Sequence, residues 1–441
     1  MAANQIQIVV LDDDPTGIQT VHGCYLLTDW NPDTLRTALA DERRFFYVLT
    51  NTRAYSREKA QRIIGQIMTN VMQANEEFGY TLVFVSRSDS TLRNHFPAET
   101  DVIVQHLESR AGEPVDAIFL VPAFIECGRV TARDTHFLVE GGRRIPVSET
   151  EFARDSVFGY RAATLPDYIE EKTSGAVPAS AVRSISLELL RNTAESNQAL
   201  EALLQNLGNH TYVVVNAETY ADLNCFAQAA LKQVAAGKQF MFQSAGSLVK
   251  ALSGIPDKPL LDGKIVRRRG RGLFIAGSHV QKTTAQLQRL LESGAVEGIE
   301  VAVEAILKSG AAQQRLISER IQTIWRNGKT PVVFTSRAEL QFNSKDERLC
   351  AGETISHFLA ELVRHLPECP SYLVAKGGIT SHDILVQGLA VSRARVLGQV
   401  LPGVPVIMTP DDSRFPQMPY VIFPGNVGDP DALLRVFDIL N

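Results

Sequence analysis

The chain has 441 residues, of which 45% are hydrophobic, and a prior of roughly 150 residues per domain predicts two or three domains with a core each. Its 44 Lys and Arg against 49 Asp and Glu give a net charge of −5, so no overall basic field points to nucleic acid or an anionic membrane. Five scattered cysteines without a C-x-x-C pair argue against a disulfide framework and a zinc site. No apolar run approaches the roughly 20 residues of a bilayer span. We therefore expect a cytoplasmic protein whose partners are small molecules, with no nucleic acid and no membrane.

In the first half, short β-branched or aromatic runs alternate with longer segments of helical period, which predicts βαβ units around a mostly parallel sheet. Five strands are expected, at Gln5–Leu11, Phe45–Thr50, Thr81–Ser86, Asp116–Val121 and Thr211–Asn216. Four apolar residues between the second and third strands make one helix face, namely Ile63, Ile64, Ile67 and Val71. The segment Thr131–Pro178 has no clean period, which predicts a long irregular excursion of the kind that often carries function.

The second half repeats this pattern. Strands are expected at Gly272–Ala276, Pro331–Thr335, Ser371–Ala375, Val404–Met408 and Tyr420–Phe423. One of the helices between them carries the apolar residues Ile355, Phe358, Leu359, Leu362 and Leu366. Residues 254–271 combine proline, glycine and arginine without periodicity, which predicts a linker or hinge. The sequence thus predicts two α/β domains, 1–253 and 272–441, with mostly parallel sheets facing each other across an interdomain cleft.

The first predicted strand ends in three carboxylates and a turn, Asp12-Asp13-Asp14-Pro15-Thr16-Gly17. Ligands bind at the carboxyl ends of strands in open α/β sheets. Three adjacent carboxylates repel each other unless a cation or a proton donor lies among them, which favours recognition of a substrate hydroxyl, a general base, or Mg²⁺ ligation through water. The alternative is a solvated turn with an Asp helix cap.

Two further polar clusters follow predicted strands, Thr50–Arg53 and Ser86–Arg93. Together with the three aspartates they would line one rim with acceptors and donors suited to a polyhydroxylated carboxylate, whose acid end an arginine could hold bidentately. The alternative for Arg53 is a structural ion pair, and for Ser88, Ser90 and Thr91 it is an ordinary helix N-cap.

In the second half, glycine turns follow three strands, at Gly277-Ser278-His279, Lys376-Gly377-Gly378-Ile379-Thr380 and Pro424-Gly425-Asn426-Val427-Gly428. Backbone N–H groups freed at such turns, aligned with a helix dipole, bind anions. Three turns of this kind in one domain favour phosphate binding. The chain has neither a Walker motif nor a G-x-G-x-x-G fingerprint, which disfavours a P-loop NTPase and a conventional NAD-binding domain.

Taken together and in this order, the motifs resemble the four-carbon acid sugar kinase family, formerly a domain of unknown function. The resemblance covers nearly the whole chain. It implies an amino-terminal domain that binds the acid sugar and a carboxy-terminal domain that binds ATP, with Mg²⁺ as a further cofactor. The implied activity is phosphoryl transfer, in the cleft, to the terminal hydroxyl of a tetronate or 3-oxo-tetronate.

The resemblance also assigns residues. Those that match family positions for the substrate are Asp13, Asp14, Arg53, Arg87, Ser88, Asp89 and Ser90. Those that match positions for ATP are Ser278, Gly377, Gly378, Ile379, Thr380 and Gly425. The general base is expected among Asp13, Asp14 and Asp89, with Asp13 favoured, and no side chain is assigned as a direct metal ligand. Many members resemble Ala-Asp-Asp-Phe-Thr-Gly-Ala at the first motif, so Pro15, Gln19 and His22 mark a departure that bears on the choice of substrate.

Two alternatives from other classes stay open. One is a binding protein that senses a nucleotide or metabolite with the same two domains and no turnover, which ADP release would distinguish. The other is a dehydrogenase, which the missing glycine fingerprint disfavours. The assembly state is left open as well, with a homodimer as one option.

Overall fold

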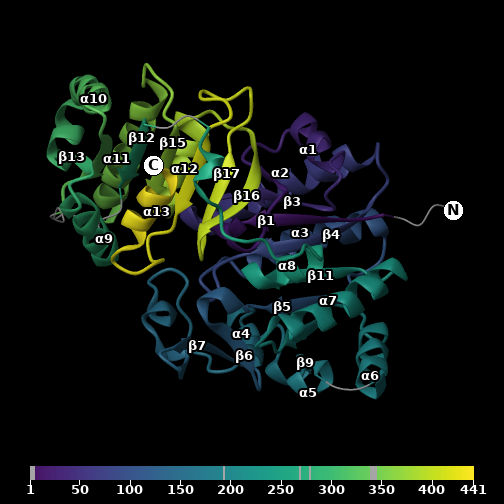
Figure 1. Cartoon of the computed structure of the whole chain (residues 1–441). Helices are drawn as coiled ribbons and strands as arrows, with labels where there is room; N and C mark the ends of the chain where they lie inside the picture. Colours follow the sequence, from purple (N-terminus) through teal and green to yellow (C-terminus); the bar gives the residue numbers. More distant parts are fainter. Residues whose placement is uncertain (1–4, 192–193, 268–269, 278–279, 338–344) are drawn as a thin grey trace. The chain divides into compact units, whose positions relative to one another are not determined.

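A computed structural model shows two α/β units, Met1–Asp257 and Lys258–Asn441, drawn in Figure 1. It describes residues 5–191, 194–267, 270–277, 280–337 and 345–441. The prediction of two α/β domains with mostly parallel sheets is confirmed. That the domains face each other across a cleft, and that residues 254–271 act as a hinge, stay predictions.

Eight strands form the sheet of the first unit, and every neighbouring pair runs parallel. In spatial order they are β2 (Tyr25–Leu27), β3 (Phe45–Leu49), β1 (Ile6–Asp12), β4 (Thr81–Arg87), β11 (Phe240–Ser244), β5 (Ala117–Val121), β10 (Thr211–Val215) and β9 (Arg183–Ile185). All five predicted strands are present, and β2, β9 and β11 are additional. The first two of these additional strands are only three residues long, too short to show a period.

Helices cover both faces of this sheet. They are α1 (Pro32–Leu39), α2 (Arg57–Asn75), α3 (Ala98–Ala111), α4 (Leu165–Lys172), α5 (Leu187–Leu190), α6 (Ala194–Gln205), α7 (Tyr220–Ala235) and α8 (Gly246–Ser253). Alternate residues of β5 serve the two faces: Leu120 packs in the cluster that contains the buried side chains of α1 to α4, whereas the Phe119 ring lies 5.0 Å from Phe226 of α7. Burial on both faces explains why the strands are almost continuously apolar.

The expectation of an irregular excursion at Thr131–Pro178 is wrong for its first part. Three strands form a separate antiparallel sheet there, β6 (Arg129–Ala132), β7 (Thr135–Glu140) and β8 (Arg143–Pro146). Two-residue turns join them, at Arg133–Asp134 and Gly141–Gly142, and all four turn residues have positive φ. Tight hairpins of this hand need positive φ at both central positions. The sequence Gly141–Gly142 therefore indicates a tight hairpin turn, whereas Arg133–Asp134 does not.

The sheet of the second unit is parallel over five strands and antiparallel at one edge. In spatial order its strands are β13 (Val296–Val301), β14 (Thr330–Thr335), β12 (Gly272–Ala276), β15 (Tyr372–Lys376), β18 (Pro419–Phe423), β17 (Val404–Met408) and β16 (Arg393–Leu401). Its helices are α9 (Gln281–Glu292), α10 (Val303–Arg326), α11 (Lys345–Arg364), α12 (Gly378–Asp383) and α13 (Ala432–Leu440). Leu261, Ile265 and Val266 pack on its core, so part of the predicted linker belongs to this unit.

Both units begin with the same strand order, β2-β3-β1-β4 in the first and β13-β14-β12-β15 in the second. In each, the first strand lies between the third and the fourth, so the chain crosses over it and the strand order reverses there. Ligands of open α/β sheets bind outside the carboxyl ends of strands at such a reversal. The fold therefore indicates one candidate site beside β1 and another beside β12.

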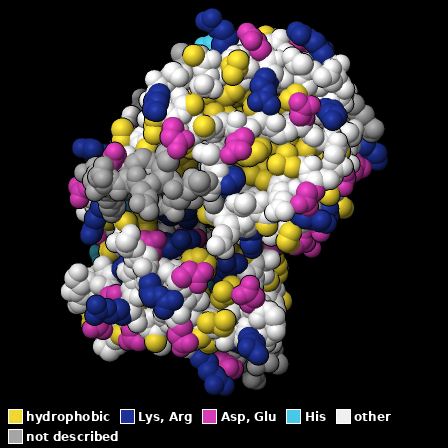
Figure 2. Space-filling model, turned by 90° about the vertical axis from the view of Figure 1, so that its left-hand side faces the viewer, with side chains coloured by type: hydrophobic (Ala, Val, Ile, Leu, Met, Phe, Trp, Pro, Cys, Tyr) yellow, Lys and Arg dark blue, Asp and Glu magenta, His cyan; other side chains and the backbone are white. Residues whose placement is uncertain are grey.

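Charged side chains of both signs are interspersed over the face drawn in Figure 2. Interspersed charge of this kind fits the nearly balanced composition of the chain. Among the described helices, none is long and apolar enough to cross a membrane.

Candidate functional site

Asp12 ends β1 and is fixed by its neighbours. The register places it beside Arg87 of β4, and Arg87 Nη1 lies 3.3 Å from Asp12 Oδ1. Both side chains are buried. Burial raises the pKa of Asp12 to about 7, although the Arg87 guanidinium lowers it. A solvated turn, the alternative interpretation of this motif, is therefore wrong at its first two aspartates, because Asp13 is also only 3% exposed.

The turn after β1 approaches Asp12 closely at Gly17. A Cβ added to Gly17 would lie 1.7 Å from Asp12 Oδ2 and 2.2 Å from Oδ1. Contacts under 3 Å are not tolerated, so any side chain at Gly17 must displace the Asp12 carboxylate, whose Oδ1 pairs with Arg87. Glycine is needed here for space.

Gly17→Ala is therefore expected to lower the melting temperature, since it displaces the carboxylate of a buried ion pair. The measurement is a thermal melt. Gly65→Ala is the matched control: it lies in α2, and the nearest atoms to its added Cβ are 3.7 Å away, so its melting temperature should be unchanged or slightly higher. An unchanged melting temperature in Gly17→Ala would contradict this account.

Asp13 differs from its neighbours in how weakly its carboxylate is held: the Asp89 backbone N–H lies near it but makes no hydrogen bond of normal geometry. Among the described residues, neither of its side-chain oxygens has a hydrogen-bond partner, and the nearest cation, Arg53 Nη1, lies 3.9 Å from Oδ1. Burial raises the pKa of Asp13, whereas Arg53, Arg87 and the nearby Asp89 amide lower it. Buried unsatisfied acceptors are rare in native proteins and mark functional sites.

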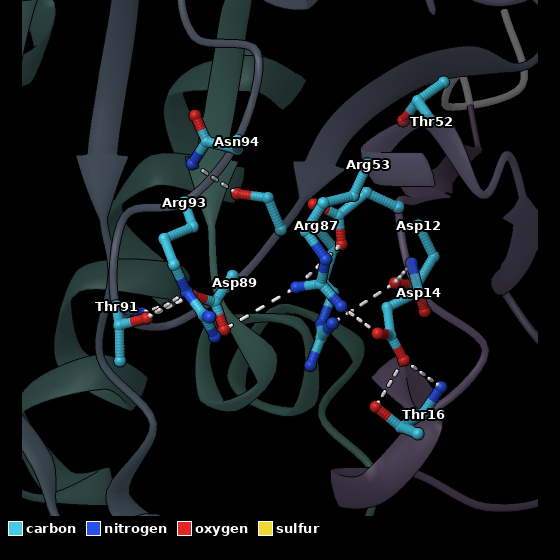
Figure 3. Close-up of polar contacts among 12 residues, drawn as sticks. Asp12, Asp14, Thr16, Thr52, Arg53, Arg87, Asp89, Thr91, Arg93 and Asn94 are labelled. Atoms are coloured by element: carbon cyan, nitrogen blue, oxygen red, sulfur yellow. Dashed lines mark hydrogen bonds and ion pairs between the residues drawn. The ribbon is translucent and has the colours of Figure 1, made fainter. Parts of the chain in front are cut away.

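Arg53 connects the polar residues that follow β1, β3 and β4. It lies in the short turn after β3 and pairs with the Asp14 carboxylate, and its Nη1 is 3.6 Å from Asp89 Oδ1 (Figure 3). The alternative prediction for Arg53 was a structural ion pair, and this pair is present at the predicted rim. Asp14 is further held by the backbone N–H and the hydroxyl of Thr16, at 2.8 and 2.6 Å. The Arg53 side chain remains 24% exposed, so an incoming anion can reach it.

Asp89 is the most strongly held of the three candidate bases. Arg93 Nε lies 2.9 Å from its Oδ2, which also accepts from the Thr91 hydroxyl (Figure 3). Burial alone would raise its pKa, but Arg53 and Arg93 lower the pKa of Asp89 to about 2. This carboxylate is ionised and already satisfied, which makes it a weak proton acceptor.

The Ser88 hydroxyl is available as a hydrogen-bond donor. Its Oγ accepts from Asn94 Nδ2 at 2.9 Å and from Gln243 Nε2 at 2.6 Å, so the hydroxyl is oriented as a donor. The N-cap alternative for Ser88, Ser90 and Thr91 is wrong, because the next helix begins only at Ala98 and no side chain caps it.

Sequence reasoning missed several side chains at this rim. Glu99, in the first turn of α3, is 5% exposed, and burial raises its pKa to about 7. His95 Nε2 lies 3.2 and 3.0 Å from the carbonyls of Thr52 and Tyr55, on either side of Arg53. Gln243 could have been found had β11 been predicted, since it lies one residue before that strand ends. Glu99 and His95 gave no local signal.

Gln19 and His22 are two of the three residues that mark the departure from the family motif, and Gln19 lies in the short helical turn Gly17–Thr20. Gln19 is buried. The imidazole Nε2 of His22 is 2.9 Å from the Pro256 carbonyl. His22 is therefore hydrogen-bonded to the last residues of the first unit.

In the second unit, the turns after β15 and β18 are tied together. Lys376 is 1% exposed and donates through Nζ to the carbonyls of Pro424 and Gly425, the latter at 3.3 Å. Burial, with Lys282, lowers the pKa of Lys376 to about 7. The Gly377 N–H donates to the Phe423 carbonyl at 2.9 Å. The expectation of a freed N–H at Gly377 is thus wrong, and the free amides are those of the first turn of α12, after it.

The remaining predicted nucleotide residues surround this turn. Ile379 is 65% exposed, whereas Thr380 is buried. A Cβ on Gly277 would lie 2.4 Å from Thr380 Oγ1, so the turn after β12 contacts that after β15. Ser278 lies outside the described residues.

Two further polar side chains lie at this edge. Gln286 of α9 donates to the carbonyls of Val427 and Asp429, at 3.0 and 2.9 Å, and thereby fixes the turn after β18. Arg337 follows β14 and donates to Thr284 Oγ1 at 2.8 Å. Its Nη1 is buried without a partner among the described residues. Arg337 could have been found from its position directly after the predicted strand β14.

Comparison with protein families identifies both halves. Residues 8–252 match the model of a sugar-binding N-terminal domain, and residues 273–433 match that of a nucleotide-binding C-terminal domain. The chain belongs to the four-carbon acid sugar kinase family. No curated protein matches it.

Two solved structures share the fold of this acid sugar kinase family member. One is a Haemophilus influenzae protein of the family DUF1537, 16% identical, with a TM-score of 0.66 over 98% of this chain and 100% of its own. The other, from Salmonella typhimurium LT2, is 16% identical, with a TM-score of 0.70 over 98% of each chain. At this identity the likeness supports the two-domain architecture.

Proposed function

We propose that this protein is an ATP-dependent kinase that phosphorylates the terminal hydroxyl of a four-carbon acid sugar, a tetronate or 3-oxo-tetronate. One observation carries the proposal most directly. Of the three candidate aspartates, Asp14 and Asp89 have oxygens occupied by hydrogen bonds and close ion pairs, whereas neither buried oxygen of Asp13 has a hydrogen bond of normal geometry to a described residue. A substrate hydroxyl would supply such a hydrogen bond.

Asp13 is proposed as the general base. The hydroxyl oxygen of the acid sugar forms a bond to the γ-phosphorus, the bond from that phosphorus to the bridging oxygen breaks, ADP leaves, and Asp13 takes the hydroxyl proton. Since burial raises the pKa of Asp13, this carboxylate is a stronger base than one in water. Arg53 and the segment Arg87–Ser90 orient the acid sugar.

The second unit is proposed to hold the nucleotide, which supplies the phosphoryl group. The residues assigned are those of the glycine turns: Ser278, Gly377, Gly378, Ile379, Thr380 and Gly425. The first-turn amides of α12 fit a phosphate, and so does Arg337 Nη1, which has no partner among the described residues. Among the described residues, no three acidic, His or Cys side chains could hold a metal ion. Mg²⁺ in kinases is held largely by phosphates and water, so we propose that it arrives with the nucleotide.

The decisive experiment measures ADP release by the full chain with ATP, Mg²⁺ and a panel of four-carbon acids, with the product identified by mass spectrometry. The expected result is a phosphorylated tetronate or 3-oxo-tetronate. ATP binding in a thermal-shift assay without ADP release from any acid would contradict the kinase and favour the non-catalytic binding protein.

Lys376→Met should raise KM for ATP about tenfold and leave KM for the acid unchanged. The variant leaves the carbonyls of Pro424 and Gly425 without their donor, so the turn after β18 loses its tie to β15. Steady-state kinetics with each substrate varied in turn is the measurement. An equal change in both KM values would argue against a nucleotide role for these turns.

A further inference from the structure

Three successive carbonyls of the segment Ser88–Arg93 accept hydrogen bonds from side chains far away in the sequence. His136 Nε2 lies 2.8 Å from the Ser90 carbonyl, the Tyr160 hydroxyl 3.3 Å from that of Thr91, and the Tyr168 hydroxyl 3.2 Å from that of Leu92. A carbonyl can only accept, so all three side chains are donors. They come from β7, from the loop that follows β8, and from α4.

His136 is fixed as a neutral donor. Because Nε2 carries the hydrogen that Ser90 accepts, Nδ1 accepts from the Thr131 hydroxyl at 2.9 Å. Burial lowers the pKa of His136 to about 4. The contact is therefore constant over the whole physiological pH range.

The segment needs this support because one of its residues is strained. Leu92 is 3% exposed and has a φ of +67°, in the left-handed region that a branched side chain disfavours. Such a conformation persists only where the surrounding structure determines it, and it is found at ligand-binding sites. The carbonyl that Tyr168 holds is that of Leu92 itself.

The supporting residues are themselves anchored to the main sheet. The backbone of Thr131 exchanges two hydrogen bonds with Ala217, at 2.9 and 3.0 Å. Asn216, directly after β10, accepts from the Asp134 N–H at 2.8 Å and donates to the Asp134 carboxylate at 2.7 Å. The hairpin β6–β7 is thereby fixed to the carboxyl end of β10.

Aromatic packing fixes the two tyrosines. The Tyr168 ring stacks on Phe96 at 5.9 Å and meets Tyr160 edge-on at 5.1 Å. Tyr168 is 1% exposed. Their hydroxyls are thus held in place by packed rings with little freedom to move.

We propose that the sheet β6–β8 and helix α4 form a support that fixes the segment Ser88–Arg93 and so sets the affinity for the acid substrate. The inference rests on the proposed function of that segment. His136, Tyr160 and Tyr168 act as positioning residues: they contact only backbone carbonyls of the segment, while the side chain of Asp89 faces Arg53 at the rim.

The test uses Tyr160→Phe, Tyr168→Phe and the double variant, which keep the rings and remove only the hydroxyls. Each lost hydrogen bond should shift the balance between the held and released segment about fivefold, so KM for the acid should rise by up to about fivefold in each single variant and up to about 25-fold in the double variant. KM for ATP should stay within about twofold. Tyr212→Phe is the control, because its buried ring also contacts Phe96. Unchanged KM for the acid, or an equal rise in the control, would overturn the proposal.

Hydrogen exchange of the full chain without any substrate separates this inference from the proposed function. Amides of residues 88–93 should exchange about 25-fold faster in the double variant than in the unaltered protein and in Tyr212→Phe. If exchange accelerates but no acid is phosphorylated by the unaltered chain, the kinase proposal fails and the support stands. If acids are phosphorylated but neither exchange nor KM changes, the support fails and the kinase stands.

Discussion

Asp13→Asn is expected to lower kcat about 1,000-fold, with little change in KM for either substrate. The asparagine fills the same space but cannot accept the hydroxyl proton, and positioned general bases contribute about 10²–10⁴-fold. The measurement is steady-state ADP release with the acid sugar that the panel identifies.

The same substitution has an expected signature in pH. Burial raises the pKa of Asp13 above its ordinary value of 3.8. Between pH 3.8 and the raised pKa, the folded protein therefore binds more protons than the unfolded chain. The free energy of unfolding must then fall as pH rises through that window. Asp13→Asn should therefore be more stable than the unaltered protein at pH 8, and this advantage should shrink toward pH 4.

Asp14→Asn and Asp89→Asn are the comparisons that decide the assignment. Each replaces a carboxylate that pairs with Arg53, so each should weaken binding of the acid and lower kcat far less than Asp13→Asn. A fall of about 1,000-fold in kcat for Asp89→Asn, with Asp13→Asn active, would transfer the role of base to Asp89.

Arg53→Ala is expected to raise KM for the acid about 100-fold while KM for ATP stays within about twofold. Charge-assisted contacts are worth roughly 1.5–3 kcal/mol, and Arg53 is the partly exposed guanidinium between Asp14 and Asp89. Arg57→Ala removes an exposed arginine at the start of α2 and should change neither KM. Equal effects of Arg53→Ala on both substrates would contradict the assignment of the acid site to the first unit.

Much of the fold could be predicted from apolar runs and their period. β1 and β12 are runs of buried apolar residues followed by turn residues, and both were found within one residue. β11 was missed because its five residues end in Gln243 and Ser244, which do not continue an apolar run. The hairpin at Arg133–Asp134 was missed because neither residue favours the positive φ that both adopt.

The site could be located from the sequence but not resolved into roles. Carboxyl ends of adjacent parallel strands lie together, which was enough to place Asp13, Arg53 and Asp89 at one rim. Which aspartate lacks a donor depends on the directions of Thr16 and Thr91, and these follow from turn geometry. Tyr160 and Tyr168 lie 69 and 76 residues along the chain from the carbonyls that they bind. At such separations no local sequence pattern predicts a contact.

The position of β11 has a consequence for how the chain matures on the ribosome. β11 is the last strand of the first unit to be synthesised, yet it lies between β4 and β5 and pairs with both. Until Ser244 has emerged, these two strands have unpaired edges facing each other, and exposed edges of this kind invite aggregation. The nascent protein should therefore depend on chaperones while the residues between β5 and the end of β11 are translated, and slower elongation over that stretch should lower its yield.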